Sequence, residues 1–376
     1  MLRTPIYQFH VDQGAQMVEY AGWEMPMKYE GIAKEHQQVR TSGGMFDVSH
    51  MGRLELKGLH ARRLLERVCS RRIGTMKEHR CRYTLITNER GGVKDDALVY
   101  RMDDDSFLIV VNGANRAKIV DHFRGVIDAD GLKVDLNDTT EKTAMLAAQG
   151  PRIPELVSRV SNEIPSLKKY QFTVKNFLVM KLIVSRTGYT GEDGFEVIMP
   201  ANAVQMAMKL LMKDIDPKAP ESPMKPAGLG ARDTLRIEAG MPLYGHELGE
   251  DINALATGLD FAISLDKNED EDGATFIGQD ALVKTREEGG TPRTLVGLRV
   301  EGRRTARQGM AVRVAGEEER IGEITSGCVS PTLEASIAMA YVDRRHATEG
   351  TPLEIETGRA ELPATVTPLP FYKRPS

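Results

Sequence analysis

The chain has 376 residues, of which 41% are hydrophobic and 28% charged, and its formal net charge is −4. This is the composition of an ordinary soluble globular protein of two or three domains, and no apolar run approaches the ~20 residues of a membrane span. The negative balance excludes a global field that would favour nucleic acid. Three scattered cysteines are too few for a disulfide framework or a zinc site and fit a reducing compartment.

The first 60 residues predict two strands and a helix. Residues 17–31 indicate a strand followed by a loop with Pro26, and residues 30–42 a polar helix. The stretch FDVSHMG at 46–52 precedes an alternating strand, RLELKG. Asp47, Ser49 and His50 suggest a catalytic triad, but neighbours on one strand face opposite sides and the chain has no GxSxG motif. We therefore interpret this stretch as a structural strand or a pocket wall.

Residues 60–82 form a strongly basic segment, with eight lysines or arginines against two glutamates. Leu64, Leu65 and Val68 have helical spacing, so the first part is predicted to be an amphipathic helix. The positive charge indicates either a solvated helix face or a docking surface for an acidic partner or a polyanionic ligand tail.

Residues 83–116 contain three apolar runs separated by two turns, the pattern of an antiparallel meander. The second turn sets three opposed pairs: Arg101 with Phe107, Leu98 with Val110, and Asp96 with Asn112. One face of this hairpin is then apolar in its middle and ends in a carboxylate and an amide. A partly desolvated carboxylate on a rigid strand suits proton handling at a bound heterocycle. Alternatively, Asp95 and Asp96 only begin a strand near solvent.

The middle of the chain predicts a buried strand at 142–151, a helix at 153–161 and a strand at 177–185. The stretch RTGYTGEDGFEVIMP, 186–200, places three glycines in a tight loop before another strand. It matches neither a Walker loop nor GxGxxG, so it gives no support for phosphate binding. Its glycines indicate close backbone approach, with Tyr189 available to stack on a flat ligand and Glu196 on the outgoing strand. The alternative is a plain glycine-rich hairpin.

Helices are predicted at 202–214 and at 226–240, the second stopped by Gly240. Arg232 and Arg236 share one face of it and could bind a ligand carboxylate, or pair internally with Asp233 or Glu238. The acidic run 266–274 is expected to be a linker or surface loop. Beyond about residue 290, short strands with glycine turns predict a small all-β domain.

Several motifs in this order resemble the aminomethyltransferase (T-protein) family of the glycine cleavage system. They are TPIYQFH, AGWEMP, FDVSHMG, GGVKDDALVY to VVNGANR, AAQGP, RTGYTGEDGFEV, GLGARDTLRIEAGMPLYG, ITSGCVSPTL with AMAYV, and LPFYKR. The resemblance extends nearly end to end. The family pattern often has alanine where this chain has Gly113 and Gly230.

This resemblance implies an α+β fold: a three-domain, cloverleaf-like, folate-binding transferase with mostly antiparallel sheets. The implied first domain is discontinuous, residues 1–50 plus 140–265; residues 51–139 form a second α+β domain carrying Asp96. Residues 280–376 form a C-terminal β-barrel or jelly-roll domain. The implied reaction transfers the methylene carbon of an aminomethyl group from the lipoyl arm of the H-protein to tetrahydrofolate, and releases ammonia, 5,10-methylenetetrahydrofolate and dihydrolipoyl protein.

The resemblance also assigns roles to residues. Asp96 corresponds to the catalytic carboxylate that orients the folate and handles its proton. The implied folate contacts are Tyr83, Val110, Asn112, Tyr170, Tyr189, Glu196, Arg232 and Arg359. Tetrahydrofolate is the implied co-substrate, and no metal, flavin or nicotinamide is expected.

The implied partner is the lipoylated H-protein, with docking through the basic segment 60–82, and neither nucleic acid nor membrane is expected. Alternatives are a demethylase or sarcosine-type folate domain of the same fold, a non-enzymatic folate-binding assembly factor, and a nucleic-acid binder using the basic segment. The N-terminus has no signal peptide and almost no room for a transit peptide. We expect the mitochondrial matrix if the source is eukaryotic, slightly favoured by Cys328 in TSGC, and the cytoplasm if it is bacterial.

Overall fold

The computed structural model describes residues 1–177, 180–269, 273–358 and 361–375, and the chain groups into two compact units. Unit 1 comprises Met1–Leu65, Ile73–Tyr83 and Ala97–Asp233. Unit 2 comprises Glu66–Arg72, Thr84–Asp96 and Thr234–Ser376. The three-domain division implied by the sequence stays a prediction.

The helices are short and bury one apolar face. Within the described residues the α-helices are α1 (Tyr7–Asp12), α2 (Ile32–Thr41), α3 (Ala61–Val68), α4 (Arg116–Ala129), α5 (Ile153–Ser158), α6 (Val204–Leu211), α7 (Leu229–Glu238) and α8 (Gln279–Glu287). Leu64, Leu65 and Val68 of α3 are buried, which confirms the predicted amphipathic helix. Gly240 follows α7 with a φ of 62°, the left-handed conformation that ends helices.

The strands form three open sheets and a barrel across the described residues. The three-stranded sheet has the order β1 (Leu2–Arg3), β3 (Trp23–Lys28), β2 (Gln16–Tyr20). The six-stranded sheet has the order β11 (Phe172–Phe177), β12 (Met180–Ser185), β13 (Gly194–Pro200), β10 (Thr143–Gln149), β4 (Gly44–Asp47), β14 (Lys225–Pro226). The five-stranded sheet has the order β6 (Cys81–Thr87), β7 (Val93–Arg101), β8 (Ser106–Val111), β5 (Gly52–Lys57), β9 (Asp135–Asp138). Strands β6 and β7 each contribute residues to both units.

The six-stranded sheet forms the main core of unit 1. Its inner strand β10, TAMLAAQ, lies between β13 and β4 and is buried almost throughout, as a continuous apolar run predicts. Side chains from β10 and β13 pack with those of α5 and α6, among them Leu146, Phe195, Leu156 and Met208. Glu196 lies near the beginning of β13, directly after Phe195 of this core.

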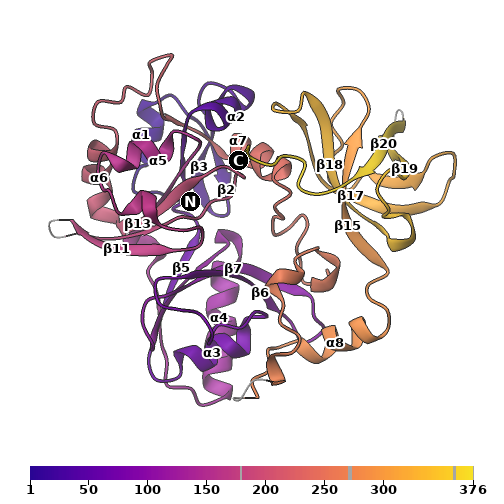
Figure 1. Ribbon diagram of the computed structural model, residues 1–376, viewed down its shortest axis with the longest axis horizontal. Coiled ribbons are helices and arrows are strands. Elements are labelled where there is room, and N and C mark those ends of the chain that lie inside the picture. The colour runs from indigo at the N-terminus through magenta and orange to yellow at the C-terminus, as the bar shows by residue number, and fades with distance from the viewer. Residues whose placement is uncertain (178–179, 270–272, 359–360, 376) are drawn as a thin grey trace. The chain divides into compact units, whose positions relative to one another are not determined.

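The C-terminal strands close into the predicted barrel. Their order is β15 (Arg293–Val300), β18 (Ala335–Asp343), β17 (Arg320–Ser330), β16 (Ala311–Val314), β19 (Pro352–Glu356) and β20 (Glu361–Thr367), drawn in yellow tones in Figure 1. Alternate residues, such as Leu298 and Val300 on β15, fill the interior. Closure leaves no exposed sheet edge.

The hairpin register predicted for β7 and β8 is confirmed. Arg101 pairs with Phe107 and Leu98 with Val110, and the ladder runs to Ala97 opposite Val111. The third predicted pair, Asp96 with Asn112, stays a prediction. The two-residue alternation and the position of the polar turn were sufficient to set this register.

Two local predictions are wrong. Pro26 lies inside β3 rather than in a loop, at a register shift between Gln16 and Met17 of the partner strand, and an irregular position tolerates a residue without an N–H donor. The run 177–185 is not a single strand, because β11 ends at Phe177 and pairs antiparallel with β12 from Met180. Both strands are β-rich, so composition does not distinguish two paired strands from a single one; residues 178–179 of the run lie outside the described residues.

Candidate active site

The predicted carboxylate and amide lie beside the ends of the confirmed hairpin ladder. Asp96, on β7, is half-buried and directly precedes Ala97. Asn112 is also half-buried and directly follows Val111, the last residue of β8. Val110 is buried on β8. Asp95 is fully buried, so the expectation that this acidic pair merely begins a strand near solvent is wrong for Asp95.

Tyr170 has an unusual backbone conformation. Its φ is 61°, a left-handed value that is uncommon for a bulky residue and found mostly where surrounding structure imposes it. Two backbone hydrogen bonds hold it: the Tyr170 amide donates to the Arg186 carbonyl at 3.0 Å, and its carbonyl accepts from the Cys81 amide at 2.8 Å. Tyr170 is thereby tied to the glycine loop and to the start of β6, two residues before Tyr83.

The glycine loop 186–194 is anchored from both sides. Arg186 forms an ion pair with Asp193, with Nε 2.9 Å from Oδ1. Buried Arg40 donates to the Thr190 carbonyl at 2.7 Å and to Glu192 at 2.8 Å. The loop that carries Tyr189 is therefore held in one conformation before any ligand arrives.

The glycines serve close packing within the protein. A Cβ on Gly188 would lie 1.9 Å from Oε1 of Gln149, and one on Gly194 would lie 2.2 Å from the Ala148 carbonyl oxygen. The close backbone approach predicted from the sequence is thus an approach to β10.

Arg232 and Tyr189 form the clearest recognition pair in unit 1. The guanidinium carbon of Arg232, on α7, lies 4.7 Å from the centre of the Tyr189 ring. Among the described residues, Nη1 of Arg232 is buried without a hydrogen-bond partner. A buried guanidinium nitrogen with no partner is uncommon in folded proteins and is explained well by a ligand acceptor. Arg236, on the same helix, forms a fully buried ion pair with Glu247 at 2.7 Å.

Glu196 is a buried carboxylate with a raised pKa. Only 8% of the residue is exposed. Burial raises its pKa, while a hydrogen bond from Thr187 and the charge of Arg232 act in the opposite direction. Its carboxyl oxygens can accept hydrogen bonds from the N–H groups of a heterocycle.

A hydrogen-bonded chain missed by the sequence analysis leads to this carboxylate. The Tyr100 hydroxyl lies 3.1 Å from Ser185 Oγ, Ser185 Oγ lies 2.7 Å from Thr187 Oγ1, and Thr187 donates to Glu196. Ser185, the last residue of β12, and Thr187 are two positions apart, a spacing that is only a weak signal of a shared side. The sequence carries no signal that joins them to Tyr100.

Asp47, Ser49 and His50 do not form a nucleophilic triad. Asp47 Oδ2 lies 2.8 Å from His10 Nε2, and its other oxygen accepts from the Ser49 amide. Ser49 Oγ donates to the Met145 carbonyl. These contacts support the structural interpretation of FDVSHMG.

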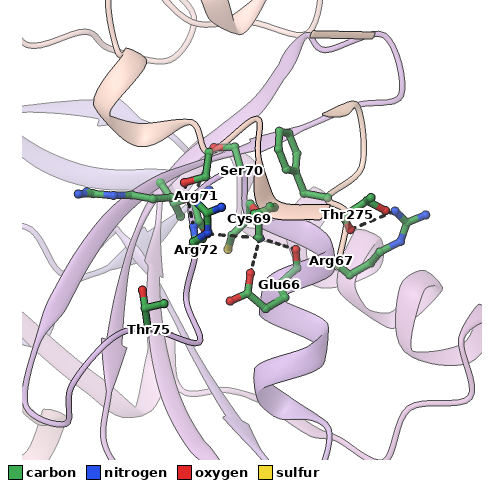
Figure 2. A network of polar contacts seen from close by, with 12 residues as sticks. Glu66, Arg67, Cys69, Ser70, Arg71, Arg72, Thr75 and Thr275 are labelled. Carbon is green, nitrogen blue, oxygen red and sulfur yellow. Dashed lines mark hydrogen bonds and ion pairs between the residues drawn. The ribbon is translucent and has the colours of Figure 1, made fainter. Parts of the chain in front are cut away.

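Part of the basic segment 60–82 is engaged inside unit 2. Arg67 donates to the Thr275 carbonyl (Figure 2). Arg72 pairs with Asp266 at 2.9 Å. Lys267 is only 1% exposed and pairs with Glu66 at 2.5 Å. The start of the run 266–274 is therefore packed against α3, and is not the linker or surface loop that the acidic composition predicted. The interpretation of the whole basic segment as a free docking face is therefore too broad.

Among the described residues, no group of three or more histidine, cysteine or acidic side chains is placed to hold a metal ion. None of the described helices has the length and apolar character of a membrane-spanning segment.

Comparison with known proteins decides the family. The GCVT N-terminal domain model matches residues 6–267, and the glycine cleavage T-protein C-terminal barrel domain model matches residues 293–373. The chain belongs to the glycine cleavage T-protein family. It is 44% identical to an aminomethyltransferase of Rubrobacter xylanophilus (99% of this chain, 94% of the relative), and 41% identical to that of Symbiobacterium thermophilum (99% and 98%).

A solved T-protein agrees with the fold. The crystal structure of the glycine cleavage system aminomethyltransferase T from Bartonella henselae superposes with a TM-score of 0.90 at 29% identity, covering 99% of this chain and 98% of that one. The predicted α+β transferase fold with a C-terminal barrel is confirmed, as is an enzyme of the aminomethyltransferase type. These relatives are bacterial, so they give no support to the mitochondrial expectation.

Proposed function

We propose that this T-protein family enzyme transfers the methylene carbon of an aminomethyl group from the lipoyl arm of an H-protein to tetrahydrofolate. The observation that carries the proposal is the cluster of Arg232, Tyr189 and Glu196 in unit 1. It combines an aromatic face, a cation with an unpartnered nitrogen and a desolvated carboxylate. A flat, polar heterocycle such as a reduced pterin matches all three features.

In this proposal the folate is held chiefly by unit 1 residues. Glu196 accepts hydrogen bonds from pterin N–H groups, Tyr189 stacks on the ligand, and Arg232 donates to an acceptor atom. The remaining proposed contacts are Tyr83, Val110, Asn112 and Tyr170. Arg359, also predicted to contact folate, lies outside the described residues.

The proposed chemistry forms two carbon–nitrogen bonds and breaks two bonds to the methylene carbon. Nitrogens 5 and 10 of the folate each bond to this carbon and each lose one proton. The amine leaves as ammonia and the lipoyl sulfur as a thiol, each taking up one proton. Holding both reactants in near-attack geometry contributes up to ~7–11 kcal/mol in favourable cases.

Asp96 is the proposed catalytic carboxylate. Its half-buried position at the start of the β7–β8 ladder supports a role in orienting the folate and handling its proton. A positioned acid or base of this kind contributes ~10²–10⁴-fold to a rate.

We further propose that the H-protein docks through the solvated part of the basic segment. Arg62, Arg63 and Lys77 are exposed, unlike Arg67 and Arg72, which bond within unit 2. A basic surface suits an acidic carrier protein. The bacterial relatives favour the cytoplasm as the compartment.

The function is tested by supplying the full-length protein with aminomethyl-loaded H-protein and tetrahydrofolate and measuring ammonia and methylenetetrahydrofolate. We expect both products in equal amounts, and none when tetrahydrofolate is omitted. Formaldehyde transfer from methylated amines instead would indicate a demethylase. Folate binding without turnover of either donor would indicate an assembly factor.

A further inference from the structure

The turn that carries His50 is held by an unusually complete set of buried polar contacts. The fully buried Arg53 side chain donates to the carbonyls of Ser49, at 3.0 Å, and Met51, the two neighbours of His50. The same guanidinium donates to the carbonyls of Thr140 and Thr143. Arg53 thus fixes the backbone on both sides of His50.

A second set of contacts holds the turn from the other direction. Asp47 accepts from the Ser49 amide at 2.8 Å. Ser49 Oγ donates to the Met145 carbonyl at 3.2 Å and accepts from the Met145 amide at 3.0 Å. These bonds join the turn to β10 in the main core, so the position of the His50 backbone is rigidly defined.

His50 itself lacks such a contact at one ring nitrogen. The residue is 4% exposed, and within the described part of the chain its Nδ1 is buried with no hydrogen-bond partner. Its ring packs edge-on against Tyr20, with centroids 5.4 Å apart. On another side it meets the backbone of Gly113, where an added Cβ would lie 3.2 Å from His50 Cδ2. A buried ring nitrogen without a partner, beside a turn held by this many hydrogen bonds, requires an explanation.

Two features connect His50 with the candidate folate site. Gly113 directly follows Asn112, a proposed folate contact. Burial, followed by the charge of Arg232, lowers the pKa of His50 to about 3. The imidazole is therefore neutral at physiological pH, with one donor and one acceptor nitrogen. Nη1 of Arg232 is likewise buried and unpartnered among the described residues.

We propose that His50 is a further ligand contact: its buried Nδ1 forms a hydrogen bond to the folate that Arg232 also contacts. This inference rests on the proposed function. A guanidinium offers only donors, whereas a neutral imidazole can also accept. The pair therefore fits a ligand edge on which a donor N–H adjoins an acceptor, as in the amide-like edge of a pterin. His50 acts as a polar contact and not as a proton acceptor in the reaction.

Three variants of the full-length protein test this assignment. His50→Leu removes the nitrogen, His50→Asn keeps a polar atom near the place of Nδ1, and His246→Leu is a control. His246 Nδ1 lies 3.0 Å from the Thr325 carbonyl, so this histidine already has its partner. For each protein, thermal melting is measured without ligand and tetrahydrofolate binding by calorimetry.

A ligand contact and a structural histidine give opposite results. We expect His50→Leu to melt at or above the wild-type temperature, because an unsatisfied buried nitrogen is removed, and to bind tetrahydrofolate roughly 5- to 100-fold more weakly. His50→Asn should regain part of the affinity, and His246→Leu should melt lower with unchanged affinity. Wild-type affinity in His50→Leu, or affinity in His50→Asn no better than in His50→Leu, would overturn the inference. A wild-type protein that does not bind tetrahydrofolate would overturn the proposed function as well.

Discussion

The guanidinium of Arg232 lies over the ring of Tyr189, with 4.7 Å between the guanidinium carbon and the ring centre. Helix α7 supplies the arginine, and the doubly anchored glycine loop supplies the tyrosine. A planar cation stacked on an aromatic ring keeps its edge available for hydrogen bonds to a ligand. The stacking of Arg232 on Tyr189 therefore predicts how variants of Arg232 bind tetrahydrofolate.

Replacing Arg232 by lysine should keep the charge and lose the planar fork. We expect tetrahydrofolate affinity, measured by calorimetry, to fall about 3- to 30-fold, since cation–π contacts contribute ~0.5–2 kcal/mol. Arg286→Lys is the matched control, because Arg286 is exposed and forms only a long ion pair with Asp260, at 3.7 Å. Equal affinities in both variants would show that Arg232 does not contact the ligand.

Glu196 should make stability depend on pH. Its folded-state pKa lies above the unfolded value, so its contribution to stability is fully present below the unfolded pKa and is lost as pH rises through the folded pKa. Glu196→Gln, which cannot ionise, should therefore melt above wild type at pH 8, with a smaller difference at pH 5. The same variant should bind tetrahydrofolate more weakly. A melting difference that does not change with pH would contradict the raised pKa.

The ion pair between Arg40 and Glu192 should stabilise the glycine loop. Both side chains are almost fully buried, so Glu192→Gln leaves a buried arginine without its counter-charge. We expect a loss of about 3 kcal/mol in the apparent free energy of unfolding in urea. The control Asp260→Asn disrupts an exposed pair and should change stability by less than about 0.5 kcal/mol. A loss for Glu192→Gln as small as that of the control would mean that the loop is held by other contacts.

Lys267 should be a structural residue of unit 2. Its ammonium donates to the carbonyls of Glu66 at 2.7 Å and Cys69 at 2.9 Å, at the end of α3. Lys267→Met should lower the apparent free energy of unfolding by about 3 kcal/mol, because it leaves these carbonyls and the Glu66 carboxylate without their donor. Lys284→Met removes an exposed lysine and serves as the control. A Lys267 variant as stable as the control would show that Lys267 does not stabilise unit 2.

Local patterns predicted much of the fold. Alternation and turn residues set the β7–β8 register, and helical spacing located α3 and α7. Contacts between residues far apart in the chain carry no such pattern. Tyr100 reaches Ser185, and Lys267 reaches Glu66, only because the tertiary fold brings them together. The sequence also predicts a loop at Lys267, because a buried lysine among acidic neighbours has no recognisable pattern.

The candidate site was predictable only in part for the same reason. Tyr189, Glu196 and Arg232 lie in recognisable motifs, and the structure relates all three in unit 1. The sequence indicates only that His50 belongs to a structural strand or a pocket wall, since nothing in FDVSHMG shows that one of its ring nitrogens lacks a partner among the described residues.

The central claim is that Asp96 is the catalytic carboxylate of a folate-dependent aminomethyl transfer. The most direct test compares wild type and Asp96→Asn for two quantities: ammonia release from aminomethyl-loaded H-protein and tetrahydrofolate affinity. We predict a rate lower by about 10²–10⁴-fold with affinity within a few-fold of wild type, since the amide keeps the shape and loses the charge. A variant that retains the wild-type rate would contradict the account.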